Sequence, residues 1–122
     1  MRGSSAIERL LRATPAPKLQ VFVVWEPILP TDWFTPTSGT LARISDPRAV
    51  QFWDHDHVVS RVLSAALPAG QPNCCRHGGA LWDDIVLFPA GRRLGVASPS
   101  WISGPIVDST ATLRQQLAAL AP

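Results

Sequence analysis

The sequence contains no tyrosine, one methionine, one lysine and only two cysteines among its 122 residues. Its uninterrupted apolar runs, such as residues 21–25, are far shorter than the roughly 18–20 residues of a membrane-spanning helix, so we expect no membrane partner. The first residues carry arginines and Glu8 instead of a continuous apolar region, which argues against a signal peptide. We therefore expect a cytoplasmic protein.

Charge and composition limit the class of protein further. Hydrophobic residues make up 46% of the chain and charged residues 16%, which excludes an intrinsically disordered chain. The formal net charge is only +2, too balanced for a protein whose affinity depends on phosphate contacts, so we expect no nucleic-acid partner. Arginine outnumbers lysine ten to one, which we interpret as the codon bias of a GC-rich bacterial genome. The length fits one domain over residues 1–122, in which residues 1–17 form a helix and a proline linker.

Prolines, capping residues and apolar spacing divide the chain into short elements. Ser5 and Glu8 have the spacing of a capping box, Asp46-Pro47 is typical of a helix start, and residues 21–25 are rich in β-branched and aromatic side chains. Such patterns predict helices near residues 5–13, 38–53, 57–67 and 109–120, and strands at 21–25, 85–88 and 101–103. The side chains that we expect in the core are Phe22, Val24, Leu41, Phe52, Val62, Ile85, Leu87, Leu113 and Leu117.

Two stretches carry a resemblance to a known fold. One is VFVVW, followed by a loop and a helix, and the other runs from DDIVLFPAGRRL through WISGP to STATLRQQLAAL. Together they resemble the thioredoxin-like fold superfamily. The resemblance implies an α/β fold with a small central mixed sheet of three or four strands covered by helices. In such a sheet residues 85–88 lie antiparallel beside 21–25 and pair with 101–103.

The residues that would carry thioredoxin chemistry are missing. No C-x-x-C motif occurs, the positions of the family's two cysteines fall near Leu29 and Asp32, and the position of its proline falls near Asp83. Thiol–disulfide exchange through the loop after residue 25 is therefore not expected. No complete catalytic motif is present, and we expect no cofactor. The chain resembles a divergent member of the superfamily whose function depends on its own site.

All cysteines and histidines fall in two short segments. Cys74, Cys75 and His77 form one, and His55 and His57 form the other. Thiolates and imidazoles bind soft and borderline metal ions, but adjacent cysteines lack the spacing of structural zinc sites, so they favour a soft ion or a thiol redox pair. The alternative is one buried cysteine with histidines at the surface. Because a bridge between neighbouring cysteines is strained, we expect two free thiols in a reducing compartment.

Acidic and aromatic side chains flank the first two predicted strands. Glu26, Asp32 and Trp33 follow the first strand, and Trp82 and Asp83 precede the second. In a thioredoxin-like arrangement these two segments share one end of the sheet, which predicts an acidic, aromatic crevice for a cationic or polar-aromatic ligand. A structural role, with Asp32 as a turn cap and an arginine neutralising the acids, explains the same residues.

The sequence thus predicts a non-redox thioredoxin-like protein that binds a protein partner or a small ligand through the loop of prolines and tryptophans after the first strand. The alternative is a thiol-dependent redox or soft-metal-binding protein that uses Cys74, Cys75 and His77. Five tryptophans exceed what a small core needs, so a homodimer that packs a tryptophan-bearing face is a third hypothesis.

Overall fold

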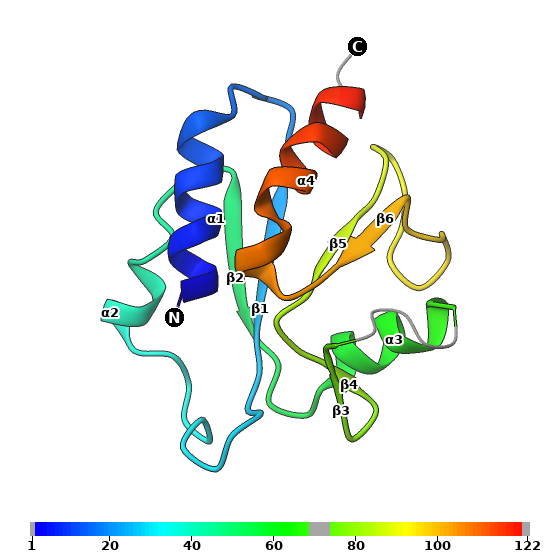
Figure 1. Ribbon diagram of the computed structural model, residues 1–122. Coiled ribbons are helices and arrows are strands. Elements are labelled where there is room, and N and C mark those ends of the chain that lie inside the picture. Colours follow the sequence, from blue (N-terminus) through cyan, green and yellow to red (C-terminus); the bar gives the residue numbers. More distant parts are fainter. Residues whose placement is uncertain (1, 69–73, 121–122) are drawn as a thin grey trace.

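Helices and short strands alternate along the chain in the computed structural model, which describes residues 2–68 and 74–120 (Figure 1). The helices are α1 (Arg2–Ala13), α2 (Ser38–Leu41), α3 (Val58–Ala66) and α4 (Ile106–Leu120). The strands are β1 (Val21–Trp25), β2 (Ala49–Trp53), β3 (Arg76–His77), β4 (Ala80–Leu81), β5 (Ile85–Leu87) and β6 (Trp101–Ser103). The protein is therefore of the mixed α/β class, as the sequence predicts. None of the helices in the described ranges has the length and apolar character that crossing a bilayer requires.

The described strands form three separate pairs instead of one central sheet. β1 and β2 are parallel, whereas β3 with β4 and β5 with β6 are antiparallel. The predicted pairing of residues 101–103 with the strand before them is confirmed, but the predicted ladder between residues 21–25 and 85–88 is wrong. All five residues of β1 pair in register with β2, from Ala49 to Trp53, and all three residues of β5 pair with β6.

The second half of the helix predicted at residues 38–53 is the strand β2, so that prediction is wrong. Asp46 does not cap a helix, because its carboxylate accepts hydrogen bonds from the backbone and the guanidinium of Arg48 at 2.7–2.9 Å. The same guanidinium donates hydrogen bonds to the carbonyl oxygens of Leu11 in the last turn of α1 and of Thr14 and Ala16 just after it. Arg48 thus ties the start of β2 to α1, and the β-branched and aromatic residues that follow continue as a strand.

The predicted capping box at the start of the first helix is also absent. α1 begins at Arg2, which places Ser5 inside the helix. Glu8 is buried and accepts hydrogen bonds from the backbone N–H and the hydroxyl of Ser45, and from Arg12. Burial alone would raise the pKa of Glu8, but these hydrogen bonds outweigh it and lower the pKa. Glu8 therefore fixes the loop before β2 against α1.

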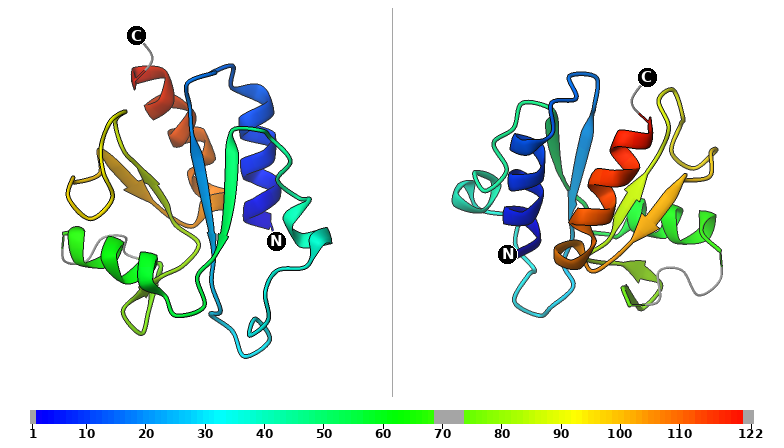
Figure 2. Two further views of the ribbon diagram at one scale, coloured as in Figure 1. Left: turned by 180° about the vertical axis from the view of Figure 1, so that it is seen from behind. Right: turned by 45° about the horizontal axis from the view of Figure 1, so that its top comes forward.

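The helices α1 and α4 lie side by side on one face of the strands (Figures 1 and 2). Between these helices and β5 lies a core cluster of Leu10, Leu87 and Leu113, against which Ile85 and Leu117 pack. The prediction that Leu87 and Leu113 are buried is confirmed. Val24, Leu41, Ile85 and Leu117, also predicted to lie in the core, are half-buried.

Three residues predicted to lie in the core are exposed instead. Phe22 is 64% exposed, Phe52 is 48% exposed and Val62 is also exposed. Seen from behind, β1 and β2 have no described helix in front of them (Figure 2, left). Alternate strand residues point to opposite faces, so Phe22 and Phe52 project from the uncovered face, where their ring centroids lie 6.1 Å apart. The prediction failed because residues 49–53 were assigned to a helix that would cover this face.

The helix α3 is joined to β4 through a side chain. The buried hydroxyl of Ser60 accepts a hydrogen bond from the backbone N–H of Leu81 and donates one to the carbonyl oxygen of Leu81 at 3.0 Å. This double contact holds the β3–β4 hairpin against α3, next to the start of β5.

The substitution Leu87→Ala tests the core. Leu87 is 9% exposed in the cluster described above, so its truncation should lower the free energy of unfolding by about 2–5 kcal/mol through lost burial and a new cavity. Urea denaturation followed by circular dichroism measures this change. The exposed Leu94 provides the matched control, because Leu94→Ala should cost less than about 1 kcal/mol. Equal losses for the two variants would contradict the position of β5 in the core.

Candidate functional site

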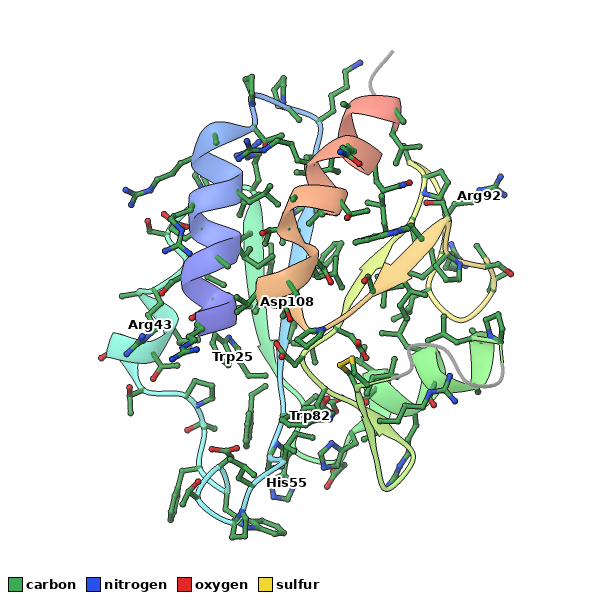
Figure 3. The ribbon with its side chains drawn as sticks, viewed as in Figure 1. Trp25, Arg43, His55, Trp82, Arg92 and Asp108 are labelled. Carbon is green, nitrogen blue, oxygen red and sulfur yellow. A yellow bond between two sulfur atoms is a disulfide. The ribbon has the colours of Figure 1, made fainter. Side chains whose placement is uncertain are left out.

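Several polar side chains meet where β1 and β2 end and β5 begins. Glu26 follows β1, His57 lies beyond the end of β2, and Asp84 directly precedes β5. β1 and β2 are parallel, so their ends lie at the same edge. Figure 3 shows His55 and Trp82 at this end of the molecule, with Trp82 the nearer of the two to the yellow disulfide. Of the residues predicted to meet here, Glu26 and Asp83 lie close enough to Asp84 for their charges to act on its carboxyl group.

His57 and Glu26 form a half-buried hydrogen-bonded pair, with 2.6 Å between Nδ1 and Oε2. Burial raises the pKa of Glu26, the hydrogen bond and charge of His57 oppose this rise, and the net shift is upward. His57 has a left-handed backbone (φ 57°) and does not cap α3. Asp54 caps the helix instead, because its two carboxylate oxygens accept from the N–H groups of Val58 and Val59.

Cys74 and Cys75 are joined by a disulfide, so the expectation of two free thiols is wrong. Their Cα atoms lie 3.7 Å apart. Cys74 is exposed, whereas Cys75 is only 3% exposed. The expectation considered the strain of the ring alone, but Cys75 also packs against Gly104, where the absence of a side chain leaves room for its sulfur. One cysteine of the pair is therefore open to solvent and the other is enclosed.

A carboxylate lies beside the enclosed half of the disulfide. Ligand atoms of Cys74, Cys75 and Asp84 all lie within 4.8 Å of one another. Both oxygens of Asp84 are buried, and neither has a hydrogen-bond partner among the residues that the structure describes. Burial raises the pKa of Asp84 to about 7, the negative charges of Asp83 and Glu26 add to the rise, and Arg76 opposes it. Asp84 therefore changes its protonation state near neutral pH.

The metal-ligand set considered from the sequence is not brought together. His55 lies beside Asp56 at 2.9 Å, and His57 is engaged with Glu26. The backbone of His77 belongs to β3, but its side chain lies outside the part of the chain that the structure describes. The cysteines form a disulfide, and the thiolates that bind metal ions are not available in this state.

The loop after β1 extends away from the disulfide. Asp32 accepts a hydrogen bond from the backbone N–H of Leu29 at 3.1 Å, which is the turn-capping role that the sequence left open. The exposed ring of Trp33 contacts His55 with 6.2 Å between centroids. Asp83, with φ 55°, accepts from the N–H of Ile106 at the start of α4, at 3.4 Å. Asp83 thus lies beside Gly104 together with the sulfur of Cys75, and Glu26 acts on Asp84 through its charge, whereas Asp32 and Trp33 belong to the outer loop.

Sequence reasoning missed the roles of Asp84 and His57. Asp84 directly follows Asp83, and the side chains of successive residues point to opposite faces of an extended chain. This alternation is the signal that either Asp83 or Asp84 faces inward, and the structure shows that it is Asp84. His57 was predicted to be either a metal ligand or a surface residue, and nothing in the spacing of 31 residues indicates its pairing with Glu26.

Comparison with known proteins returned no match, since no family model, no curated protein and no solved structure matches this chain. The function must therefore be argued from the geometry of the site.

Proposed function

We propose that the protein is a thiol–disulfide redox protein whose reactive pair is Cys74 and Cys75. The observation that carries this proposal is the buried carboxylate of Asp84 within 4.8 Å of both sulfur atoms. Burying a carboxylate without a hydrogen-bond partner is energetically costly. Groups with strongly shifted pKa values concentrate at functional sites, so such a carboxylate beside a disulfide points to a function. The sequence alone favoured partner binding, but the contacts around the disulfide give thiol chemistry the stronger support.

The exposure of the two cysteines assigns their roles. An incoming thiolate reaches the sulfur of the exposed Cys74 and forms a mixed disulfide with it, while the bond between the two cysteines breaks. The electron pair of that bond leaves on the sulfur of Cys75. A second thiolate then attacks the partner's sulfur in the mixed disulfide, which releases the oxidised partner and the thiolate of Cys74. Two thiols are thus oxidised to one disulfide, and Cys74–Cys75 is reduced by two electrons.

Asp84 supplies the proton for the enclosed sulfur. A thiolate buried as deeply as Cys75 is poorly solvated and has a higher proton affinity than a carboxyl group whose pKa is about 7. The protonated Asp84 therefore gives its proton to the departing Cys75 thiolate. In the reverse direction the carboxylate of Asp84 removes this proton, which makes Cys75 a nucleophile for reforming the disulfide.

A redox titration tests the proposal. The folded protein is equilibrated in buffers of reduced and oxidised dithiothreitol, free thiols are blocked with N-ethylmaleimide, and the number of labels is counted by mass spectrometry. We expect one reversible two-electron transition between zero and two labels. The variants Cys74→Ser and Cys75→Ser should each carry one label in every buffer. A disulfide that opens only after denaturation, or two labels under every condition, would refute the proposal.

The proposal includes a thioredoxin-like arrangement of the elements. It is supported by the chain order, in which α1 precedes the parallel strands β1 and β2 with α2 between them, and α3 and the β3–β4 hairpin precede the antiparallel pair β5–β6 and the last helix α4. It is also supported by the placement of the strands, which follow the order β2, β1, β5 and β6 in the front and rear views (Figures 1 and 2). On this arrangement the disulfide is not on the loop where the family carries its cysteines, but on the segment leading to the last strand pair.

A second candidate function is the binding of a protein partner through the loop after β1. It is favoured by the exposure of three large apolar side chains in this loop, of which Phe34 is 86% exposed, together with Leu29 and Trp33. Such side chains on a proline-stiffened loop are typical of recognition surfaces. This function predicts that the loop, and not the disulfide, is required for binding.

A further inference from the structure

An exposed tryptophan lies directly opposite the enclosed cysteine. The register of β3 and β4 pairs Arg76 with Leu81, and one step further along the hairpin it places Trp82 opposite Cys75. The backbone N–H of Trp82 donates to the carbonyl oxygen of Cys75 at 3.0 Å, which confirms this placement. The side chain of Trp82 is 41% exposed, and Figure 3 shows the residue close to the disulfide.

The indole of Trp82 has neither a ring contact nor a hydrogen bond with the described residues. Within residues 2–68 and 74–120, its ring contacts no other aromatic ring, and no acceptor for its N–H is found. By contrast, Trp25 donates to Gln51 and Trp33 contacts His55. A large aromatic side chain left exposed beside a reactive group is typical of a recognition surface, because its burial by a ligand is favourable and costs little conformational entropy.

The charged side chains around Trp82 and the disulfide limit which thiols can approach. The exposed Asp83 directly follows Trp82, and the charges that act on the next residue, Asp84, are the negative charges of Asp83 and Glu26 and the positive charge of Arg76. The negative charges of Asp83 and Glu26 disfavour the approach of an anionic thiol such as glutathione. A thiol that carries an apolar side chain and no negative charge suits both the indole and the acids.

We propose that Trp82 selects the thiol partner of the disulfide, and that this partner is a polypeptide whose cysteine is flanked by an aromatic or aliphatic side chain. The inference rests on the redox function proposed above. The apolar side chain of the partner packs on the indole and brings the neighbouring thiolate to the exposed Cys74. Trp82 is therefore a specificity-determining residue that takes no part in the bond exchange itself.

Two uncharged dipeptide thiols test this inference, N-acetyl-Phe-Cys-amide and N-acetyl-Ser-Cys-amide. Each reduces the oxidised protein, the reaction is stopped with acid, and the opened cysteines are counted by alkylation and mass spectrometry. Packing of one phenyl ring on the indole should make the second-order rate constant of the Phe peptide about fivefold to tenfold higher. Trp82→Ala should bring the ratio to about one while the rate with the Ser peptide changes less than about twofold.

The matched control is Phe22→Ala, which removes another exposed aromatic ring on the distant uncovered face of β1 and should leave the ratio unchanged. Equal rates for the two peptides with the wild-type protein, or a ratio that survives Trp82→Ala, would overturn the assignment of Trp82. Failure of both peptides and of dithiothreitol to open the disulfide would instead overturn the redox function itself.

Discussion

Replacing Gly104 with alanine is expected to lower the free energy of unfolding by about 2–3 kcal/mol. A Cβ atom at this position would lie 2.8 Å from the sulfur of Cys75 and 2.8 Å from the carbonyl oxygen of Asp83, and it would also clash with a carboxylate oxygen of Asp84. One of these neighbours is backbone and the others are enclosed, so none can move aside without disturbing the site. Urea denaturation at neutral pH measures the loss.

A second glycine provides the control for this experiment. A Cβ added at Gly39 in α2 would meet only the hydroxyl of Thr37 at 3.8 Å, so Gly39→Ala should leave the stability unchanged or raise it by up to about 1 kcal/mol. Adding Asp84→Ala to Gly104→Ala should restore about 1 kcal/mol, because one of the three close neighbours is then removed. A Gly104→Ala protein as stable as the wild type would contradict the packing of residue 104 on the disulfide.

Asp84→Asn is expected to raise the free energy of unfolding at pH 8 by about 1–2 kcal/mol and to change it little at pH 4. The pKa of Asp84 is raised from 3.8 to about 7 in the folded protein. The folded state therefore retains this proton over a pH range in which the unfolded chain has released it. The stability of the wild type should fall as the pH rises from about 4 to 7, whereas asparagine, which resembles the protonated acid, removes this dependence.

Denaturation curves at pH 4, 6 and 8 measure the effect. Asp108, in the first turn of α4, is exposed, and Asp108→Asn is the matched control, which should change the free energy of unfolding by less than about 1 kcal/mol. Parallel curves for the wild type and Asp84→Asn would show that the carboxyl group is not buried as described. The same variant has a kinetic consequence, because the reduced protein lacks its proton acceptor. Oxidation of Asp84→Asn by oxidised dithiothreitol at pH 8 should be slower by about tenfold or more.

Local patterns predicted the elements whose signals lie within the element itself. Residues 21–25 form β1 as expected from their apolar, β-branched run, and the leucine spacing after residue 109 belongs to α4. Residues 49–53 were assigned wrongly because Asp46-Pro47 is compatible with both a helix start and a turn. The hydrogen bonds of Arg48 favour the turn, and their acceptors are carbonyl groups more than 30 residues earlier in the chain. No local pattern contains that information.

The candidate site could be predicted only in part, because some of its contacts join segments that no local pattern connects. Glu26 and the acids before β5 were expected at one end of the strands because of their position relative to the predicted strands, and they lie there. The approach of Asp84 to the disulfide involves Gly104, between β6 and α4, which packs against both groups. Spacing along the sequence does not predict such a contact between three distant segments.

The contact of Ser60 with Leu81 has a consequence for hydrogen exchange. The amide proton of Leu81 is held by a hydroxyl group of α3, so it exchanges with solvent only when the helix separates from β4. The next amide, that of Trp82, is held by the carbonyl oxygen of Cys75 and exchanges when the segment that carries the disulfide moves. Two consecutive amide protons therefore report two independent motions, and their deuterium uptake would separate an opening of α3 from a rearrangement around the cysteines.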